Sequence, residues 1–422
     1  MTVDIVGREA ELASIHAFLE RPAVGAVALV LEGEAGIGKS TLWLAGVDSA
    51  RERGFRVLVS RPAEAERGLT HAGLGDLFEE ALESVVPVLP APRRHALEVA
   101  LLVKEAPDGF DPRTLGVAVR SALEVLAAEG PVVLAIDDVQ WLDPSSASAL
   151  AFALRRLDDR SILLLLARRL GERAETPDLE LAIRDDRLER LHVEPLSLGA
   201  THQLLQAHLA LTLARLTLLR VHETSGGNPF YALELARALG ADVDPTQPLR
   251  VPESLEGLVR ARVDKLPRAT RESLLLAAAA GRPSAELLAS LGVTERVLDR
   301  ARAARVIERT DGTIRFTHPL LASVVYHGVS ADERRRTHGR LAQVVADPLD
   351  RARHLALSTE SPDTQIAAAL EDAAALAGTR GAAIAAAELA GHALRLTLPG
   401  ADADRDRRAL VAARAHRNAG EW

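Results

Sequence analysis

The 422-residue chain contains no cysteine, which excludes disulfide scaffolds, zinc sites built on cysteine and cysteine nucleophiles. Lysine is almost as scarce, with only Lys39, Lys104 and Lys265, so arginine supplies nearly all of the 51 basic residues. Aromatic residues make up 3% of the chain, and Met1 is its one methionine. Because lysine is so rare, each lysine is worth examining for a function.

Long apolar runs are also missing. Segments such as Val24–Leu31 and Ile162–Ala167 fall far short of the roughly 18 residues that a membrane-spanning helix needs. The N-terminus is charged too early for a secretory signal peptide. We therefore expect a cytoplasmic protein without a membrane partner. The net charge of −8 is unfavourable for general binding to nucleic acid, although a local basic patch is not excluded.

What the chain does contain is enough apolar material for several cores. Hydrophobic residues make up 48% of it, which is too much for a disordered chain. Most of them are alanine, leucine and valine, a composition that favours helices. The length corresponds to two to four domains.

Short apolar runs alternate with helical patterns through the first 195 residues. Most of the runs are apolar at consecutive positions, as in strands that are covered on both faces. This alternation predicts an α/β fold, with a parallel sheet and helices on both faces. The predicted strands are Ala26–Glu32, Arg56–Ser60, Val132–Asp137, Ile162–Ala167 and Leu191–Glu194. The predicted helices between them are Ser40–Arg53, Gly73–Glu83, Arg93–Lys104, Thr114–Glu129 and Pro144–Leu157.

The rest of the chain reads as mostly helical. Gly240–Pro252 has the composition of a linker. Asp311-Gly312 separates two short strand patterns, and a hairpin with helices on either side predicts a winged-helix unit. From Ala331 onward, small residues at helical spacing suggest tetratricopeptide-like helical hairpins, with the last one truncated. The other helices that we expect here are Leu198–Leu209, Pro229–Leu239, Ser254–Leu266, Ala269–Ala280, Glu295–Ala304, Gln365–Ala377, Ala382–Leu396 and Arg405–Asn418.

A phosphate-binding loop follows the first predicted strand, where residues 33–40 fit the pattern G-x-x-x-x-G-K-[ST]. Its glycines let the backbone wrap a phosphate with N–H groups pointing inward, and the following helix adds its positive end. Lys39 is a point charge that can reach the β- and γ-phosphates, Ser40 offers a hydroxyl to Mg²⁺, and Thr41 suits the α-phosphate. The predicted nucleotide-binding residues of this loop are Gly33, Glu34, Ala35, Gly36, Ile37, Gly38, Lys39, Ser40 and Thr41.

Two acids end the strand that begins at Val132. Carboxylates there lie at the carboxyl edge of the sheet, where open α/β folds bind their ligands. We expect Asp137 to join Ser40 in holding Mg²⁺, and Asp138 to orient or polarise the attacking water. Asp143 precedes a proline at the start of a helix, and we favour a helix-capping role for it over a catalytic one.

Ala167-Arg168-Arg169 ends the strand expected beside the acid strand. An arginine at that edge is placed to sense the γ-phosphate, and surface ion pairing is the alternative. We favour Arg168 over Arg169, so the predicted catalytic residues are Lys39, Asp137, Asp138 and Arg168.

Several motifs, in this order along the chain, resemble those of STAND-class ATPases. The greatest likeness is to the large ATP-binding regulators of the LuxR family, and it covers nearly the whole chain. The motifs are Ile5-Val-Gly-Arg-Glu9, the phosphate loop, Ile136-Asp-Asp-Val-Gln-Trp-Leu-Asp143, Ala167-Arg168, Ser225-Gly-Gly-Asn-Pro-Phe230 and Phe316-Thr-His-Pro-Leu320. The resemblance implies a P-loop NTPase domain over residues 1–195, a helical lid over 196–266, a winged-helix domain over 267–330 and a helical segment over 331–422.

The resemblance also implies further nucleotide contacts. Val6, Gly7 and Arg8 would lie against the adenine, unless they only lead into the first helix. Pro229 would reach the nucleotide from the lid. His318 would contact the β-phosphate, with a purely structural histidine as the alternative that the sequence leaves open.

These features lead to the hypothesis of a switch that binds ATP or ADP and hydrolyses ATP slowly with Mg²⁺. It would be the regulatory part of a transcriptional regulator, with self-association in the ATP state and an unknown effector as further partners. DNA would be contacted only through a domain absent from this chain, because the basic clusters after residue 331 are interrupted by acids. A nucleotide-dependent assembly scaffold and a small-molecule kinase are the alternatives.

Overall fold

The computed structural model describes residues 5–21, 25–103, 112–157, 159–170, 179–211, 213, 215–239, 255–281, 283–310 and 312–419. Lys104, the predicted linker Gly240–Pro252, the turn residue Asp311 and the end of the chain lie outside these residues. Among the described residues, no helix is long and apolar enough to span a membrane.

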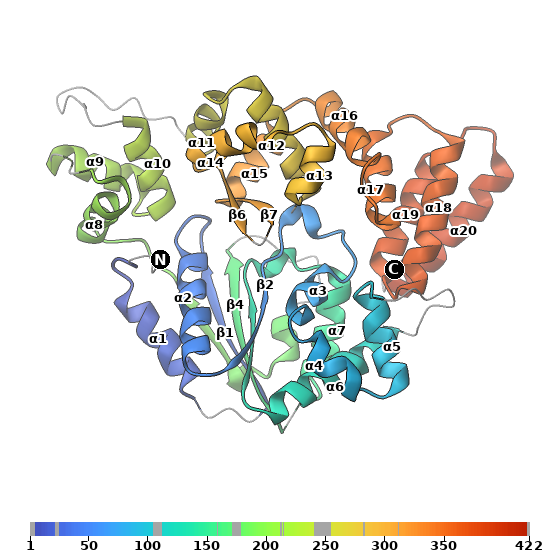
Figure 1. Cartoon of the computed structure of the whole chain (residues 1–422), viewed down its shortest axis with the longest axis horizontal. Helices are drawn as coiled ribbons and strands as arrows, with labels where there is room; N and C mark the ends of the chain where they lie inside the picture. Colours follow the sequence, from blue (N-terminus) through green and yellow to red (C-terminus); the bar gives the residue numbers. More distant parts are fainter. Residues whose placement is uncertain are drawn as a thin grey trace.

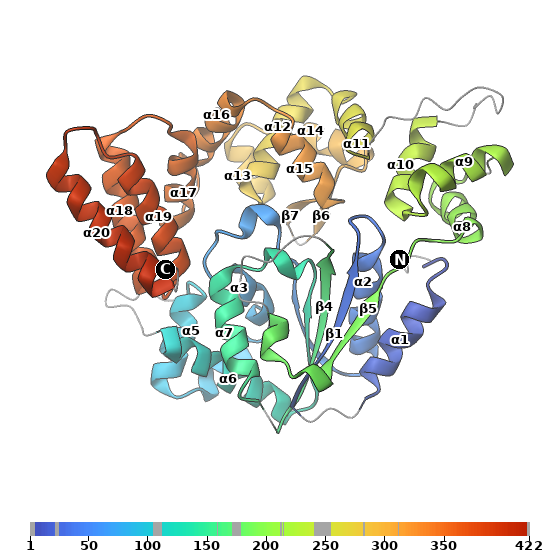
Figure 2. The same cartoon turned by 180° about the vertical axis from the view of Figure 1, so that it is seen from behind.

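A five-stranded parallel sheet forms the centre of the first part (Figures 1 and 2), as predicted. Its strand order is β2-β3-β4-β1-β5, so the strand before the phosphate loop lies beside β4, and β3 lies between β2 and β4. The strands are β1 (Gly25–Gly33), β2 (Arg56–Ser60), β3 (Val132–Ile136), β4 (Ser161–Arg169) and β5 (Leu188–His192). The predictions of β1 to β4 agree closely, whereas β5 begins three residues earlier than expected and is half-exposed.

Helices cover both faces of the sheet, because alternate residues of each strand enter different cores. In β1, Val27, Leu29 and Leu31 pack in one core with α1 (Glu9–Leu19) and α2 (Lys39–Glu52). Ala26, Ala28 and Val30 pack in the core on the other face. That face is covered by α3 (Ala72–Phe78), α4 (Leu82–Val85), α5 (Ala91–Ala100), α6 (Pro112–Ala128) and α7 (Pro144–Leu154).

The middle of the chain forms two further packing units. A small core joins α8 (Leu198–Leu209), α9 (Arg215–Ser225) and α10 (Pro229–Leu239). A larger core joins α11 (Leu255–Asp264), α12 (Arg268–Ala280), α13 (Ala285–Ser290), α14 (Glu295–Ala303), the antiparallel pair β6 (Ile307–Thr310) and β7 (Thr313–Phe316), and α15 (Pro319–His327). The predicted hairpin is thus present, while α9 and α13 were not expected. The predicted domain boundaries remain predictions: α11 shares the core of α12–α15 and also contacts α10 through the ion pair of Arg262 with Glu234.

The last helices are α16 (Ala331–Leu341), α17 (Pro348–Ser358), α18 (Thr364–Thr379), α19 (Ala383–Arg395) and α20 (Asp402–Ala419). The alanine-rich core of α17–α20 accounts for the small residues in the sequence. In Figures 1 and 2, the β6–β7 hairpin lies over the carboxyl edge of the sheet, with α8–α10 to one side and α16–α20 to the other. Distant parts of the chain therefore meet above the phosphate loop.

Candidate functional site

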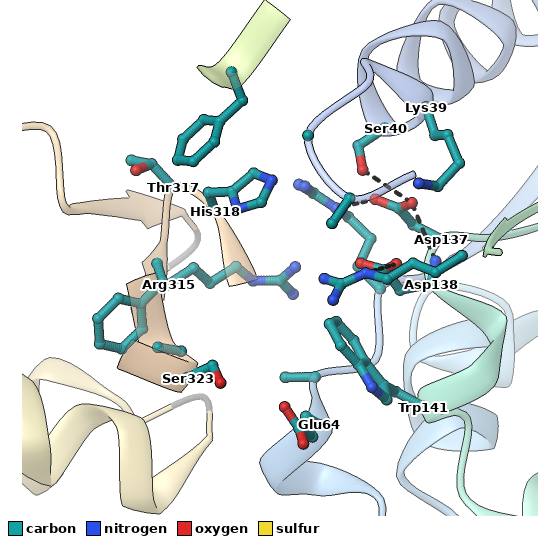
Figure 3. Close-up of a pocket in the computed structure, with 18 of the residues that line it drawn as sticks. Lys39, Ser40, Glu64, Asp137, Asp138, Trp141, Arg315, Thr317, His318 and Ser323 are labelled. Atoms are coloured by element: carbon teal, nitrogen blue, oxygen red, sulfur yellow. Dashed lines mark hydrogen bonds and ion pairs between the residues drawn. The ribbon is translucent and has the colours of Figure 1, made fainter. Parts of the chain in front are cut away.

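A cavity of about 570 Å³ lies at the carboxyl edge of the sheet, as expected for a ligand site in an open α/β fold. Its floor is the phosphate loop and the end of β3, and its roof comes from α10, the β7–α15 turn and α17. Figure 3 shows Asp137 and Asp138 on one side of this cavity, and His318 and Arg315 on the other. The site is therefore built by segments spread over more than 300 residues.

The phosphate loop has the backbone that its glycines allow. Gly36 and Gly38 have φ values of 80° and 104°, in the left-handed region that favours glycine. Lys39 is only 6% exposed, and its Nζ donates to the carbonyls of Gly33 (2.9 Å) and Glu34 (2.7 Å). Within the predicted loop, residues 35–41 line the cavity, while Gly33 and Glu34 contribute these carbonyls from outside its lining.

The side chains of Ser40 and Asp137 meet at the cavity floor. Ser40 Oγ donates to Asp137 Oδ1 over 3.1 Å, and the backbone N–H of Asp138 donates to the same oxygen over 3.1 Å. A hydroxyl and a carboxylate are hard oxygen ligands of the kind that Mg²⁺ uses when substrate phosphates and waters complete its shell. The donor set therefore fits Mg²⁺.

Opposing effects act on the pKa of Asp137. Burial raises its pKa to about 6, and the neighbouring Asp138 adds to this. The charge of Arg61 and the hydrogen bonds from Ser40 and the Asp138 backbone act in the opposite direction. A cation at this position would relieve the burial of negative charge.

Asp138 is oriented by two neighbours. Gln140 Nε2 donates to its Oδ1 over 2.8 Å, and Arg169 Nε lies 3.3 Å from the same oxygen. The Arg169 guanidinium also lies over the ring of Trp141, 4.2 Å from its centroid. Asp138 itself has φ 47°, in the left-handed region that few residues other than glycine adopt.

Of the two arginines that end β4, Arg169 lines the cavity, whereas Arg168, which we preferred, does not; the sensing of a γ-phosphate stays a prediction. Arg168 pairs with Glu32 (2.7 Å) and Glu180 (2.9 Å), and it is not in the cavity lining. The physical reason is the alternation of β4, because residue 168 shares a face with Glu32 on the neighbouring strand. The ion-pair alternative describes Arg168, whereas Arg169 faces the predicted catalytic acids.

Asp143 caps α7, as we favoured: its carboxylate accepts from the N–H of Ser146 over 2.9 Å. It also accepts from the N–H groups of His71 (3.0 Å) and Gly73 (2.9 Å), at the start of α3. Asp143 is 2% exposed, and burial raises its pKa. One buried carboxylate thus ties the β2–α3 loop to the segment after β3.

The N-terminal motif lies at the other end of the cavity. Val6 and Arg8 line it, together with apolar side chains from α8 and α10. Arg8 is 4% exposed and donates to the carbonyls of Ile37 (2.8 Å) and Glu194 (2.6 Å). Gly7 does not line the cavity, but its φ of 65° and close packing against Ala200 require glycine. This end is therefore apolar, while the floor is charged.

The lid contacts the phosphate loop directly. Asn228 Nδ2 donates to the carbonyl of Ala35 over 2.9 Å, and the N–H of Phe230 donates to the carbonyl of Gly36 over 3.2 Å. Pro229 lies between them and lines the cavity, and its contact with a nucleotide stays a prediction. The motif pointed to Pro229, but the hydrogen bonds come from its two neighbours.

His318 has a structural role, whereas the β-phosphate contact that the resemblance implies stays a prediction. Its Nδ1 accepts from the N–H of Leu320 over 3.1 Å and so caps α15. Its ring stacks on Phe230 at 3.9 Å and points toward Ser40 and Lys39 (Figure 3). Burial lowers its pKa to about 3, and the charges of Arg169 and Lys39 lower it further. The ring is therefore neutral at pH 7 with its proton on Nε2, which faces the cavity as a hydrogen-bond donor.

Sequence reasoning missed several cavity residues that belong to no motif. They come from the β2–α3 loop, β7, α15 and α17, and only the fold brings these segments together. They include Arg61, Glu64, Arg315, Tyr326, Arg353 and Leu357.

Comparison with known proteins supports the fold and the ATPase domain. Residues 4–166 match the model of the AAA ATPase domain. An uncharacterized protein of Rhizobium meliloti (strain 1021) is 25% identical over 451 residues, an alignment that covers 93% of this chain and 42% of that protein. The chain thus spans less than half the length of this curated relative.

Among solved structures, the chain is similar to a STAND protein (signal transduction ATPase with numerous domains) with a tetratricopeptide repeat sensor from Pyrococcus horikoshii. The TM-score is 0.54 at 14% identity, and the match covers 98% of this chain and 62% of that one. A Walker-type ATPase of Pyrococcus abyssi also matches over 76% of this chain and 96% of its own, with a TM-score of 0.39 at 16% identity. The likeness to the STAND protein shows a shared fold: a P-loop NTPase-like α/β part followed by a large helical part.

Proposed function

We propose that this chain is a nucleotide-driven switch that binds ATP or ADP, hydrolyses ATP slowly with Mg²⁺, and forms the regulatory part of a transcriptional regulator. The observation that carries the proposal is the make-up of the cavity. Its lining includes the phosphate loop, Pro229 of α10, His318 before α15 and Arg353 of α17. Each predicted part of the chain contributes to this lining, so the chemical state of a ligand there can bias how the parts are arranged.

The residues have distinct tasks in this proposal. Lys39 leaves the carbonyls that it now contacts and binds the β- and γ-phosphates, beside inward N–H groups of the loop. Ser40 and Asp137 hold Mg²⁺, which supplies charge neutralisation at the phosphates when bound. Asp138 is aimed by Gln140 and Arg169 and orients the attacking water.

His318 in the roof of the cavity and Arg169 at the end of β4 contact the phosphates. His318 offers its Nε2 proton to a phosphate oxygen, because its other nitrogen is committed to the cap of α15. Arg169 lies between Asp138 and the ring of Trp141 and responds to the γ-phosphate. The apolar end around Val6 takes the base. ADP holds the lid and α15 closed, and exchange for ATP repositions them and exposes a surface for self-association.

The test replaces one lysine and uses another as its control. Lys39→Ala removes a charge-assisted contact worth about 1.5–3 kcal/mol, so ATP and ADP should bind about 10- to 150-fold more weakly. Lys265→Ala removes an exposed lysine outside the cavity lining and should leave both affinities unchanged. Isothermal titration calorimetry measures both variants. Wild-type affinity in Lys39→Ala would refute the site assignment.

A further inference from the structure

Arg61 is the first residue after β2, and the sheet places it beside the predicted metal ligand. Ser60 pairs with Ile136 in the register of β2 and β3, and the N–H of Asp137 donates to the carbonyl of Ser60 over 3.0 Å. The segments that follow β2 and β3 therefore leave the sheet side by side. Arg61 Nε lies 3.7 Å from Asp137 Oδ2.

The two oxygens of Asp137 have different surroundings. Oδ1 accepts from Ser40 and from the N–H of Asp138, while Oδ2 faces the Arg61 guanidinium. The Asp137 side chain is 7% exposed, so a positive charge nearby has a strong effect on its energy. Arg61 thus supplies the kind of charge that a cation on this carboxylate would supply.

The backbone that carries Arg61 is held in place, while its side chain has room. The N–H of Ala63 donates to Glu66 Oε2 over 3.0 Å, and Arg353 of α17 donates to the carbonyl of Ala65. A side chain at Gly281 would collide with Glu66 Cγ at 2.8 Å, which shows how closely α12 packs on this loop. The Arg61 side chain itself is 31% exposed and lines the cavity.

We propose that Arg61 neutralises Asp137 while no metal is bound, and turns to the terminal phosphate of the nucleotide when Mg²⁺ takes that carboxylate. This inference rests on the proposed function, because it requires a magnesium nucleotide in the cavity. Mg²⁺ beside Ser40 on Oδ1 and the Arg61 guanidinium on Oδ2 would be two like charges on one carboxylate, so their repulsion weakens the hold of Arg61 on Asp137 when the metal binds. The displaced guanidinium has five N–H donors in a planar fork that matches phosphate oxygens.

Loss of the arginine should strengthen the effect of Mg²⁺ on nucleotide binding but slow hydrolysis. Without Arg61, nothing competes from that side for Asp137, so Mg²⁺ should strengthen nucleotide binding more than it does in the wild type. Without the fork at the phosphate, hydrolysis should slow. A residue that only supported the fold would weaken both properties together.

The experiment compares Arg61→Gln, Arg61→Lys and the control Arg56→Gln. Arg56 lies at the other end of β2, where it donates to Ser84 Oγ, so the control removes an arginine far from the site. A fluorescent ADP analogue is titrated in Mg²⁺ and in EDTA. The dissociation constant in EDTA divided by that in Mg²⁺ measures how much the metal strengthens binding. Single-turnover hydrolysis of ATP is measured in parallel.

For Arg61→Gln we expect that ratio to rise about fivefold, the effect of an ion pair of about 1 kcal/mol. The hydrolysis rate should fall about 100-fold, with a smaller change in KM. Arg61→Lys keeps the charge but loses the fork, so it should keep the wild-type ratio and still hydrolyse slowly. Arg56→Gln should match the wild type in both.

A ratio that is unchanged or lower in Arg61→Gln, or hydrolysis within twofold of wild type, would overturn the inference. Full activity in Arg61→Lys would overturn the role of the fork. Failure of the wild-type protein to bind nucleotide more tightly with Mg²⁺ would instead contradict the proposed function. Thermal unfolding of the Arg61 variants is measured alongside, and Arg61→Lys keeps the test valid if Arg61→Gln folds poorly.

Discussion

Gly36→Ala should detach the lid from the phosphate loop while leaving the α/β core folded. The added Cβ would lie 2.9 Å from Phe230 Cβ and 3.0 Å from Asn228 Oδ1, both at the start of α10. These distances are too short for carbon contacts, and Phe230 Cβ is fixed to the backbone. Moving α10 away relieves the overlap but breaks the two hydrogen bonds that Asn228 and Phe230 make to the loop.

The magnitude follows from two separable costs. Alanine at φ 80° costs about 1–2 kcal/mol, because left-handed backbone is unfavourable for residues with a Cβ. The overlap, or the loss of the two hydrogen bonds that relieves it, adds about 1–3 kcal/mol. Gly54→Ala is the matched control, because Gly54 has φ 77° and an added Cβ there meets nothing within 4 Å. It carries the first cost without the second.

The assay is hydrogen–deuterium exchange of α10 in the nucleotide-free protein, followed by ADP affinity. Gly36→Ala should show faster exchange in α10 and about 5- to 150-fold weaker ADP binding, given the second cost of about 1–3 kcal/mol. Gly54→Ala should lose stability but keep wild-type exchange in α10 and wild-type affinity. Equal behaviour of the two variants in both measurements would refute the lid contact as described here.

Two further predictions concern α17. Arg353→Ala leaves the carbonyl of Ala65 without its α17 donor, so hydrogen–deuterium exchange in the β2–α3 loop should become faster. Arg351→Ala, at an exposed position of the same helix, should leave that exchange unchanged. Equal exchange in the two variants would contradict this link. Burial, with the charge of Asp347 adding, raises the pKa of Asp350 from its ordinary range to about 6. The folded state then binds the proton more tightly than the unfolded state, so this group lowers the free energy of unfolding as the pH rises from about 4 to about 6. Asp350→Asn removes that penalty, so its melting temperature should exceed that of the wild type by an amount that grows across this window and then levels off; a pH-independent difference would contradict the burial argument.

The sequence predicted those parts of the fold whose signal is local. The inner strands β1, β3 and β4 contain runs of consecutive apolar residues, because helices cover them on both sides, and the phosphate loop has a fixed spacing of glycines and lysine. The strand β5 has the burial pattern of a half-exposed edge, and its run of Leu188–His192 contains three polar residues. Its true start therefore left no apolar signal to detect.

The site was only partly predictable for the same reason. Residues in sequence motifs, such as Lys39 and Asp137, were found because the motif and the chemistry coincide. Arg61 and Arg353 belong to no motif, and they reach the cavity only through strand register and helix packing. Strand alternation puts Arg168 and Arg169 on opposite faces of β4, but only the register with Glu32 of β1 shows which of them faces away from the cavity, and the sequence does not contain that register.

The central claim is that the nucleotide in the cavity sets the arrangement of the parts around it. Small-angle X-ray scattering of the purified chain, saturated with ADP or with a non-hydrolysable ATP analogue, tests this claim most directly. The account predicts two different scattering profiles, with a larger radius of gyration or a larger mass in the ATP-analogue state. Superimposable profiles at equal saturation would contradict it.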